Sequence, residues 1–187
     1  MKINVKSGLV ENITQIPSDN YDTRPDASNI SLIVLHNISL PAGEFGGPYI
    51  TQLFTNQLQK NDHPSFADIY QLKVSAHLLI RRDGQVIQFV AFQHRAWHAG
   101  VSEYQGQTNC NNISIGIELE GADNTPYESI QYSQLAELII ELRSGYPGIA
   151  QNAITGHSDI SPGRKTDPGP AFDWDRLHSL ITPQPEK

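Results

Sequence analysis

The stretch SLIVLHN at residues 31–37 decides the fold. Four apolar residues stand together from Leu32 to Leu35, and the polar pair His36 and Asn37 follows them directly. A continuous apolar run of this length predicts a strand buried on both faces, because a strand with one wet face alternates between apolar and polar residues. We therefore expect a central strand with a histidine at its carboxyl end.

Further strands are predicted on both sides of this one in the sequence. At residues 113–121, ISIGIELEG, branched apolar residues alternate with small or acidic ones. The Asp83–Gly84 pair between two apolar runs predicts a β-hairpin, since both residue types tolerate the backbone angles of a tight turn. Residues 153–156 predict a short strand that leads into His157. Residues 1–25 are polar and interrupted by proline, so we expect them to run over the surface.

Three helices are predicted from apolar residues at helical spacing. The first covers residues 50–58 and the second is centred on residues 135–142, with a capping box expected at 125–128. Asp173 is placed to cap the third. Strands that alternate with helices predict an α/β fold, here a single domain with a central mixed β-sheet flanked by helices.

Length and charge limit the classes of function. The chain has 187 residues, which fits one domain over 1–187 with its core at about 30–180. The formal net charge of −7 argues against nucleic acid or an anionic membrane as a partner, because both need a basic surface. A single cysteine, Cys110, and the lack of a signal-peptide pattern in the first residues predict a cytoplasmic protein, which we expect to be a monomer.

The stretch TGHSDISPGRKTDPGP at residues 155–170 concentrates charge among prolines and glycines, a composition that predicts neither helix nor strand. His157 in this stretch and His36 both follow predicted strands, and ligands gather beyond the carboxyl ends of strands in α/β sheets. Two imidazoles and one carboxylate, Asp159 or Asp167, form a three-ligand set for catalytic zinc. The alternative is that the histidines are structural and the segment is a solvated surface loop.

A glutamate on the strand at residues 113–121 is the candidate general base. Glu118 and Glu120 lie on the same face of that strand, so alternation does not choose between them. Beside a zinc-bound water, such a carboxylate accepts a proton. The alternative is that both glutamates belong to the solvated face of the sheet.

Five motifs together resemble one family. They are LHNISLPAGEFGG, SAHLLIRRDG, AWHAG, SIGIELEG and TGH followed by RKTDPGPAFDW, in this order over about residues 30–178. The resemblance is to the zinc-dependent N-acetylmuramoyl-L-alanine amidases, most closely the cytoplasmic anhydro-N-acetylmuramoyl-L-alanine amidases of the AmpD type. It implies the fold shared with peptidoglycan-recognition proteins, and zinc bound by His36, His157 and Asp167. It also implies Glu118 as general base and Lys165 as the cation that stabilises the oxyanion.

The resemblance implies a substrate as well. The bond cleaved would join the lactyl group of 1,6-anhydro-N-acetylmuramic acid to L-alanine of the stem peptide, in peptidoglycan recycling. The small soluble anhydro-muropeptide would be the only partner. Residues at matching positions would line the cleft or contact the substrate: Asn37, Ala96, Trp97 and His98. His77 is expected to be structural.

Two positions depart from the family pattern. Lys73 and Asn109 stand where an arginine is common, and neither reproduces the planar fork with which arginine binds a carboxylate. We expect altered affinity for the stem peptide. Two other readings stay open at this point: an amidase that acts on intact peptidoglycan, of the phage or autolysin type, and a peptidoglycan-binding module without catalysis.

Overall fold

A mixed six-stranded sheet forms the centre of the computed structural model, which describes residues 1–182 of the 187. The strand order is β12-β5-β11-β6-β7-β3. The first four of these strands run parallel, β6 and β7 form an antiparallel hairpin, and β3 pairs parallel to β7. The strands are β3 (Thr14–Gln15), β5 (Leu32–Ile38), β6 (Leu78–Ile80), β7 (Val86–Gln88), β11 (Ser114–Glu120) and β12 (Ile154–Gly156). The predicted α/β class with a mixed sheet is confirmed.

Strand β5 lies between β12 and β11, and its residues Leu32–Leu35 are fully buried, as the apolar run predicts. Every residue of β11 is buried too. The face of β11 that carries Glu118 is therefore not a solvated face: helices cover one side of this part of the sheet, and loops and short elements cover the other. The hairpin at Asp83–Gly84 is also confirmed, with φ of +86° at Gly84.

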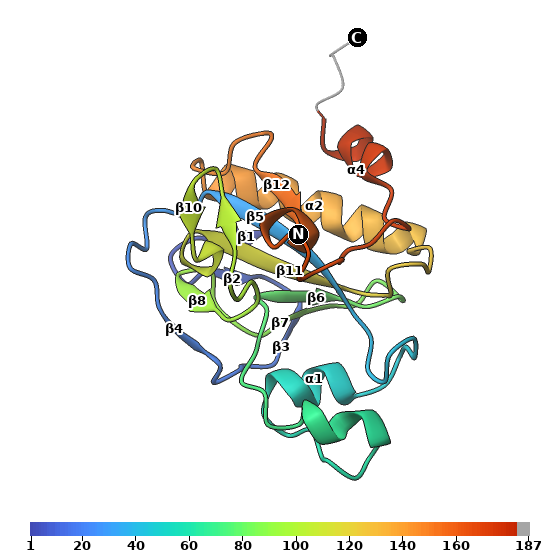
Figure 1. Ribbon diagram of the computed structural model, residues 1–187. Helices are drawn as coiled ribbons and strands as arrows, with labels where there is room; N and C mark the ends of the chain where they lie inside the picture. Colours follow the sequence, from blue (N-terminus) through green and yellow to red (C-terminus); the bar gives the residue numbers. More distant parts are fainter. Residues whose placement is uncertain (183–187) are drawn as a thin grey trace.

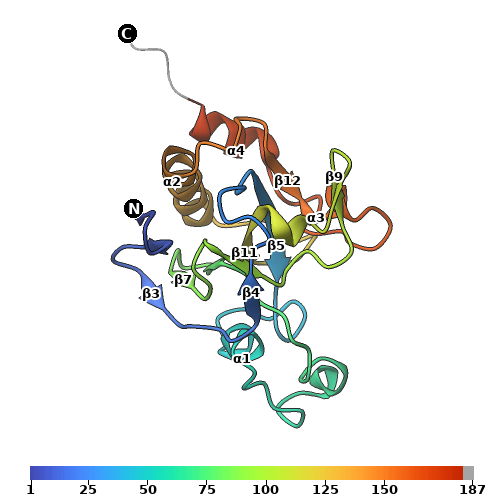
Figure 2. The ribbon, with the colours of Figure 1, turned by 90° about the vertical axis from the view of Figure 1, so that its left-hand side faces the viewer.

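Helices lie on both sides of the sheet, as Figures 1 and 2 show. Helices α2 (Ser129–Gly145) and α4 (Trp174–Ile181) cover one face and share a single apolar core with β5 and β11. Helix α1 (Tyr49–Phe54) packs on the other face of the β6–β7 hairpin, together with the 3-10 helix η1 (Pro64–Asp68). Leu58 is buried but lies outside α1, which ends four residues earlier than its apolar spacing predicts.

The two predicted helix caps have different outcomes. The side chain of Asp173 accepts a hydrogen bond from the Arg176 amide, so the cap of α4 is confirmed. The capping box expected at 125–128 is wrong. Helix α2 starts one turn later, where Glu128 is the N-cap and its amide donates to the side chain of Gln131 at 3.0 Å.

Short elements occupy the segments predicted as loops. Residues 96–112 contain the hairpin of β9 (Glu103–Tyr104) and β10 (Gln107–Thr108) and the 3-10 helix η2 (Cys110–Asn112). The helix α3 (His157–Ile160) corrects the prediction that residues 155–170 form no helix. At the N-terminal end, β1 (Ile3–Asn4) pairs with β2 (Leu9–Val10), and β4 (Tyr21–Thr23) pairs with β8 (His94–Ala96). Among residues 1–182, no helix is long and apolar enough to cross a membrane.

Candidate functional site

Three adjacent parallel strands bring their carboxyl ends to one place. His36 near the end of β5 is the register partner of Glu118 in β11. On the other side of β5, strand β12 ends at Gly156, the register partner of Leu35, and His157 follows directly. The sheet therefore sets His36, His157 and Glu118 side by side, as the position of the histidines after their strands predicts.

The loop after α3 returns Asp167 to the two histidines. Asp167 Oδ2 lies 3.0 Å from His36 Nδ1 and 3.0 Å from His157 Nδ1, and the two imidazole nitrogens are 2.9 Å apart. The Ser158 amide donates to the Asp167 carbonyl at 2.9 Å, which fixes the backbone of the loop. A Cβ atom on Gly156 would lie 2.9 Å from Pro168 Cδ, so a glycine is needed where the loop crosses β12.

Asp159 has a different place. Its Oδ2 accepts hydrogen bonds from Thr155 Oγ1 at 3.0 Å and from the Gly156 amide at 2.9 Å. The carboxylate therefore ties α3 to the end of β12. Asp167, not Asp159, joins His36 and His157 as the group of side chains whose donor atoms could hold one metal ion.

A hydrogen bond from the far side of its ring orients His157. The Nε2 atom lies 3.0 Å from the Ala99 carbonyl, which only accepts, so Nε2 carries the hydrogen and Nδ1 faces Asp167 with a lone pair. The Arg164 guanidinium donates to the same carbonyl at 2.7 Å and to the Val101 carbonyl at 2.8 Å. The sequence left Arg164 without a role, since nothing in its spacing indicates a contact with residues 99–101.

The charges of the site depend on its burial. Burial lowers the pKa of His36 to about 4, so its imidazole is neutral at physiological pH. Burial alone would raise the pKa of the Asp167 carboxyl, but the His157 and His36 imidazoles close to it hold that pKa well below its usual range. Burial and the nearby Asp167 carboxylate raise the pKa of Glu118 well above its ordinary value, against the effect of Lys165. The neutral imidazole of His36 and the anionic carboxylate of Asp167 are the protonation states in which these groups bind a cation.

A pocket of about 250 Å³ opens in front of these groups. Among the predicted site residues, it is lined by the three donor residues together with Glu118, Lys165, Asn37, Trp97 and His98. Glu118 Oε2 is buried and has no hydrogen-bond partner within residues 1–182. Asn37 Nδ2 donates to Asp123 Oδ1 at 2.8 Å and to the Pro168 carbonyl at 3.0 Å, so both amide hydrogens of this pocket residue are used within the protein.

Three of the predicted substrate contacts lie elsewhere. Ala96 is fully buried in the core of the α1 side and does not line the pocket, because its side chain points into the protein from β8. Lys73 is exposed and does not line the pocket either, although its neighbours Leu72 and Val74 do. Asn109 has a left-handed backbone, with φ of +59°, and lies beside a different hollow.

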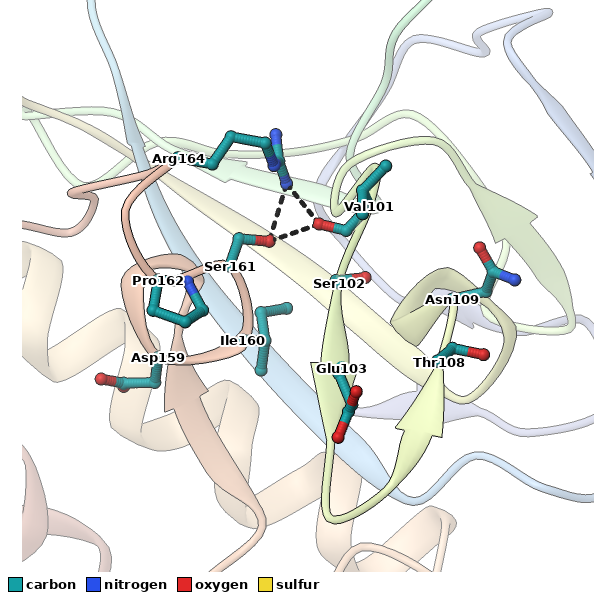
Figure 3. A pocket seen from close by; sticks show the side chains of 10 residues that line it. All are labelled: Val101, Ser102, Glu103, Thr108, Asn109, Asp159, Ile160, Ser161, Pro162 and Arg164. Atoms are coloured by element: carbon teal, nitrogen blue, oxygen red, sulfur yellow. Dashed lines mark hydrogen bonds between the residues drawn. The ribbon is translucent and has the colours of Figure 1, made fainter.

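That second hollow is larger, about 560 Å³, and lies between the β9–β10 hairpin and residues 159–164 (Figure 3). Figure 3 shows the hydrogen bonds that join Arg164, Ser161 and the Val101 carbonyl at its edge. Its lining contains no histidine and none of the three donor residues. The smaller pocket, where imidazoles and carboxylates converge, is therefore the better candidate for the functional site although its volume is lower.

His77 is built into the sheet. Its Nδ1 accepts from the Gly116 amide at 3.0 Å, and its Nε2 lies 3.1 Å from the His94 carbonyl. Burial, and then the charge of Arg24, lower its pKa well below the ordinary value. A neutral imidazole with both nitrogens occupied by the backbone has no free atom for a metal or a substrate.

Comparisons with known proteins show the family to which the chain belongs. The family described as N-acetylmuramoyl-L-alanine amidase matches residues 26–170. The 1,6-anhydro-N-acetylmuramyl-L-alanine amidase AmpD of Citrobacter freundii is 57% identical over 180 residues, which are 96% of this chain and 96% of that protein. The crystal structure of a selenomethionine derivative of AmpD superimposes with a TM-score of 0.93 at 55% identity, covering 97% of this chain and 100% of that one.

A more distant structure carries a ligand. It is the complex of the amidase AmiD from Escherichia coli with the substrate anhydro-N-acetylmuramic acid-L-Ala-D-gamma-Glu-L-Lys, at 29% identity and a TM-score of 0.60. The alignment covers 81% of this chain and 57% of AmiD. The family match over most of the chain, and the identity to AmpD over nearly the whole of it, lead to one conclusion: the chain belongs to the N-acetylmuramoyl-L-alanine amidase family.

Proposed function

We propose that this amidase hydrolyses the amide bond between the lactyl group of 1,6-anhydro-N-acetylmuramic acid and L-alanine of the stem peptide, with a zinc ion held by His36, His157 and Asp167. The observation that carries the proposal is the convergence of these three donors in a pocket that also contains Glu118. The AmpD relatives, which match nearly the full chain, support the substrate. The AmiD complex with an anhydro-muropeptide supports it from a more distant relative.

The donor set fits zinc. Histidine nitrogen and carboxylate oxygen are zinc ligands, and three protein ligands leave a position for water or substrate. His157 Nδ1 and Asp167 Oδ2 lie 3.0 Å apart, and with the hydrogen of His157 on Nε2 both atoms are acceptors, an arrangement that a cation stabilises. When bound there, zinc supplies a Lewis acid that lowers the pKa of water and polarises a carbonyl.

Glu118 is the residue that we assign to proton transfer. Its unpartnered Oε2 atom lines the same pocket as the donors, so it can accept a proton from the attacking water. Its raised pKa makes the resulting carboxylic acid persist long enough to protonate the nitrogen of the departing L-alanine. Proton transfer to that nitrogen is required because an unprotonated amine anion is a poor leaving group.

Lys165 is the residue that we assign to the developing negative charge on the carbonyl oxygen. Its side chain is exposed at the pocket and comes from the same loop as Asp167. Replacing Lys165 with glutamine is expected to lower kcat by about 10²–10³, the cost of one oxyanion donor, with little change in KM or zinc content. Steady-state kinetics on the anhydro-muropeptide measures this. A higher KM at unchanged kcat would contradict the assignment, because it would mean equal binding of substrate and transition state.

We place the reaction in peptidoglycan recycling in the cytoplasm, with a monomer of one domain over residues 1–187 and no nucleic-acid or membrane partner. The buried free thiol of Cys110 supports a reducing compartment, since a single cysteine forms no internal disulfide. Asn37 and Trp97 line the pocket and are the residues that we assign to contact the sugar and the peptide.

The test offers the purified protein a soluble anhydro-muropeptide and intact peptidoglycan side by side, each with and without a chelator. We expect cleavage of the soluble compound alone, loss of that activity on chelation, and recovery on addition of zinc. Activity that resists a chelator would contradict the zinc mechanism. Equal cleavage of the polymer would instead favour an amidase of the phage or autolysin type.

A further inference from the structure

His98 lies behind His36, on the side away from the three donor atoms. His98 Nδ1 is 2.9 Å from His36 Nε2, and the two rings meet nearly at right angles with their centres 5.0 Å apart. On its other side, His98 Nε2 is 3.2 Å from Ser114 Oγ. Ser114 Oγ in turn donates to the Cys110 carbonyl at 2.6 Å. Four groups therefore form one chain of hydrogen bonds that ends at His36.

The last member of this chain fixes the direction of all the others. A carbonyl oxygen only accepts, so Ser114 gives its one hydroxyl hydrogen to Cys110 and accepts from His98 Nε2. The hydrogen of His98 is then on Nε2, and its Nδ1 is an acceptor in the neutral ring. His36 Nε2 must therefore carry the hydrogen, and His36 Nδ1 presents a lone pair toward His157 and Asp167.

The strand and the loop hold His98 in this place. A Cβ atom on Gly116 would lie 2.4 Å from Cγ of His98, so β11 has a glycine where the ring packs against it. The amides of His98 and Ala99 both donate to Asn111 Oδ1, at 3.2 and 2.8 Å. Both ring nitrogens of His98 are used within the protein, so although the residue lines the pocket, neither nitrogen is free to bind substrate.

We propose that His98 is a positioning residue for the metal site: through the chain from the Cys110 carbonyl and Ser114, it holds His36 in the tautomer and orientation that present Nδ1 to the metal. This replaces the expectation that His98 contacts the substrate, and it rests on the proposed function. Without His98, the buried His36 Nε2–H loses its acceptor and the ring loses its orientation. Loss of such an outer partner typically costs about 10–100-fold in metal affinity.

The experiment titrates metal-free protein with Co²⁺ and follows the visible absorption of the bound ion, with chelator competition for the affinity. His98→Leu is expected to weaken Co²⁺ binding about 10–100-fold and to change the absorption spectrum. Gly116→Ala, which forces the His98 ring away, is expected to act in the same direction. Leu72→Ala is the control, because Leu72 lines the same pocket and takes no part in the hydrogen-bond chain.

A pair of polar variants keeps the test decisive if His98→Leu does not fold. Asparagine places a polar atom near the position of Nδ1 and glutamine near that of Nε2, so His98→Asn should bind Co²⁺ more tightly than His98→Gln. Equal affinities in these two variants, or an unchanged affinity in folded His98→Leu, would overturn the proposal. Failure of the wild-type protein itself to bind Co²⁺ or Zn²⁺ would instead overturn the zinc site under the proposed function.

Discussion

Replacement of Asp167 with asparagine is expected to leave a folded protein that no longer retains zinc and has no measurable amidase activity. The carboxylate is the only anionic group among the three donors, and its oxygen lies 3.0 Å from both imidazole nitrogens. Asparagine preserves the shape but removes the charge that attracts the cation. Because loss of an outer partner alone costs about 10–100-fold in affinity, we expect more than about 100-fold for loss of a ligand. Zinc content after dialysis and the rate of anhydro-muropeptide cleavage measure the two effects.

Asp159 supplies a matched control for this experiment. It stands in the same segment, and the sequence alone leaves it equal to Asp167 as the third ligand. Its carboxylate bonds instead to Thr155 Oγ1 and the Gly156 amide, so Asp159→Asn is expected to lower the melting temperature while zinc is retained. Zinc loss in Asp159→Asn and retention in Asp167→Asn would reverse the assignment. A circular-dichroism spectrum like that of the wild type shows that each variant is folded.

The site residues that could be predicted from the sequence are those that lie on or directly after a strand. A continuous apolar run that ends in a histidine predicts both the central strand and the position of His36, because the carboxyl ends of parallel strands meet at one edge. The alternation at residues 113–121 likewise predicts the face that carries Glu118, and the register of β11 with β5 sets it beside His36. The periodicity of a strand is local, so one sequence suffices to read it.

The outer partners of the site could not be predicted in this way. His98, the Ala99 carbonyl and Arg164 come from loops, and their contacts depend on how residues 96–112 and 157–167 fold against each other. The same dependence on loop conformation explains why Ala96 and Asn109 were expected to contact the substrate but do not line the pocket. Proximity along the chain to Trp97 or to Cys110 does not say which side of a loop faces the pocket, and the structure turns Ala96 into the core and Asn109 toward another hollow.

Glu118→Gln is expected to lower kcat by about 10²–10⁴, the contribution of one general acid–base group, while zinc is retained. Glutamine fills the same space but cannot accept the proton of the attacking water. The matched control is Glu120→Gln, on the same face of β11. Glu120 Oε1 accepts from the Gly46 amide and Oε2 from the Arg82 amide, so this residue braces two loops and is expected to affect stability more than kcat. Equal losses of kcat in the two variants would contradict the assignment of Glu118.

The same Glu118→Gln substitution is expected to stabilise the metal-free protein at neutral pH, opposite to its effect on catalysis. Burial raises the pKa of Glu118 in the folded state above its ordinary value of 4.5. At a pH between the ordinary pKa and the raised pKa, the folded protein therefore binds more protons than the unfolded chain. The contribution of Glu118 to the stability of the wild type is therefore most favourable below pH 4.5, and it is lost as the pH rises through the pKa of the folded state. Glutamine does not titrate, so the variant's advantage should grow with pH and then level off. The measurement is the melting temperature of both metal-free proteins from below pH 4.5 to neutral pH. If the difference in melting temperature between the variant and the wild type did not change with pH, the pKa of Glu118 would not be raised in the folded protein, and the prediction would be wrong.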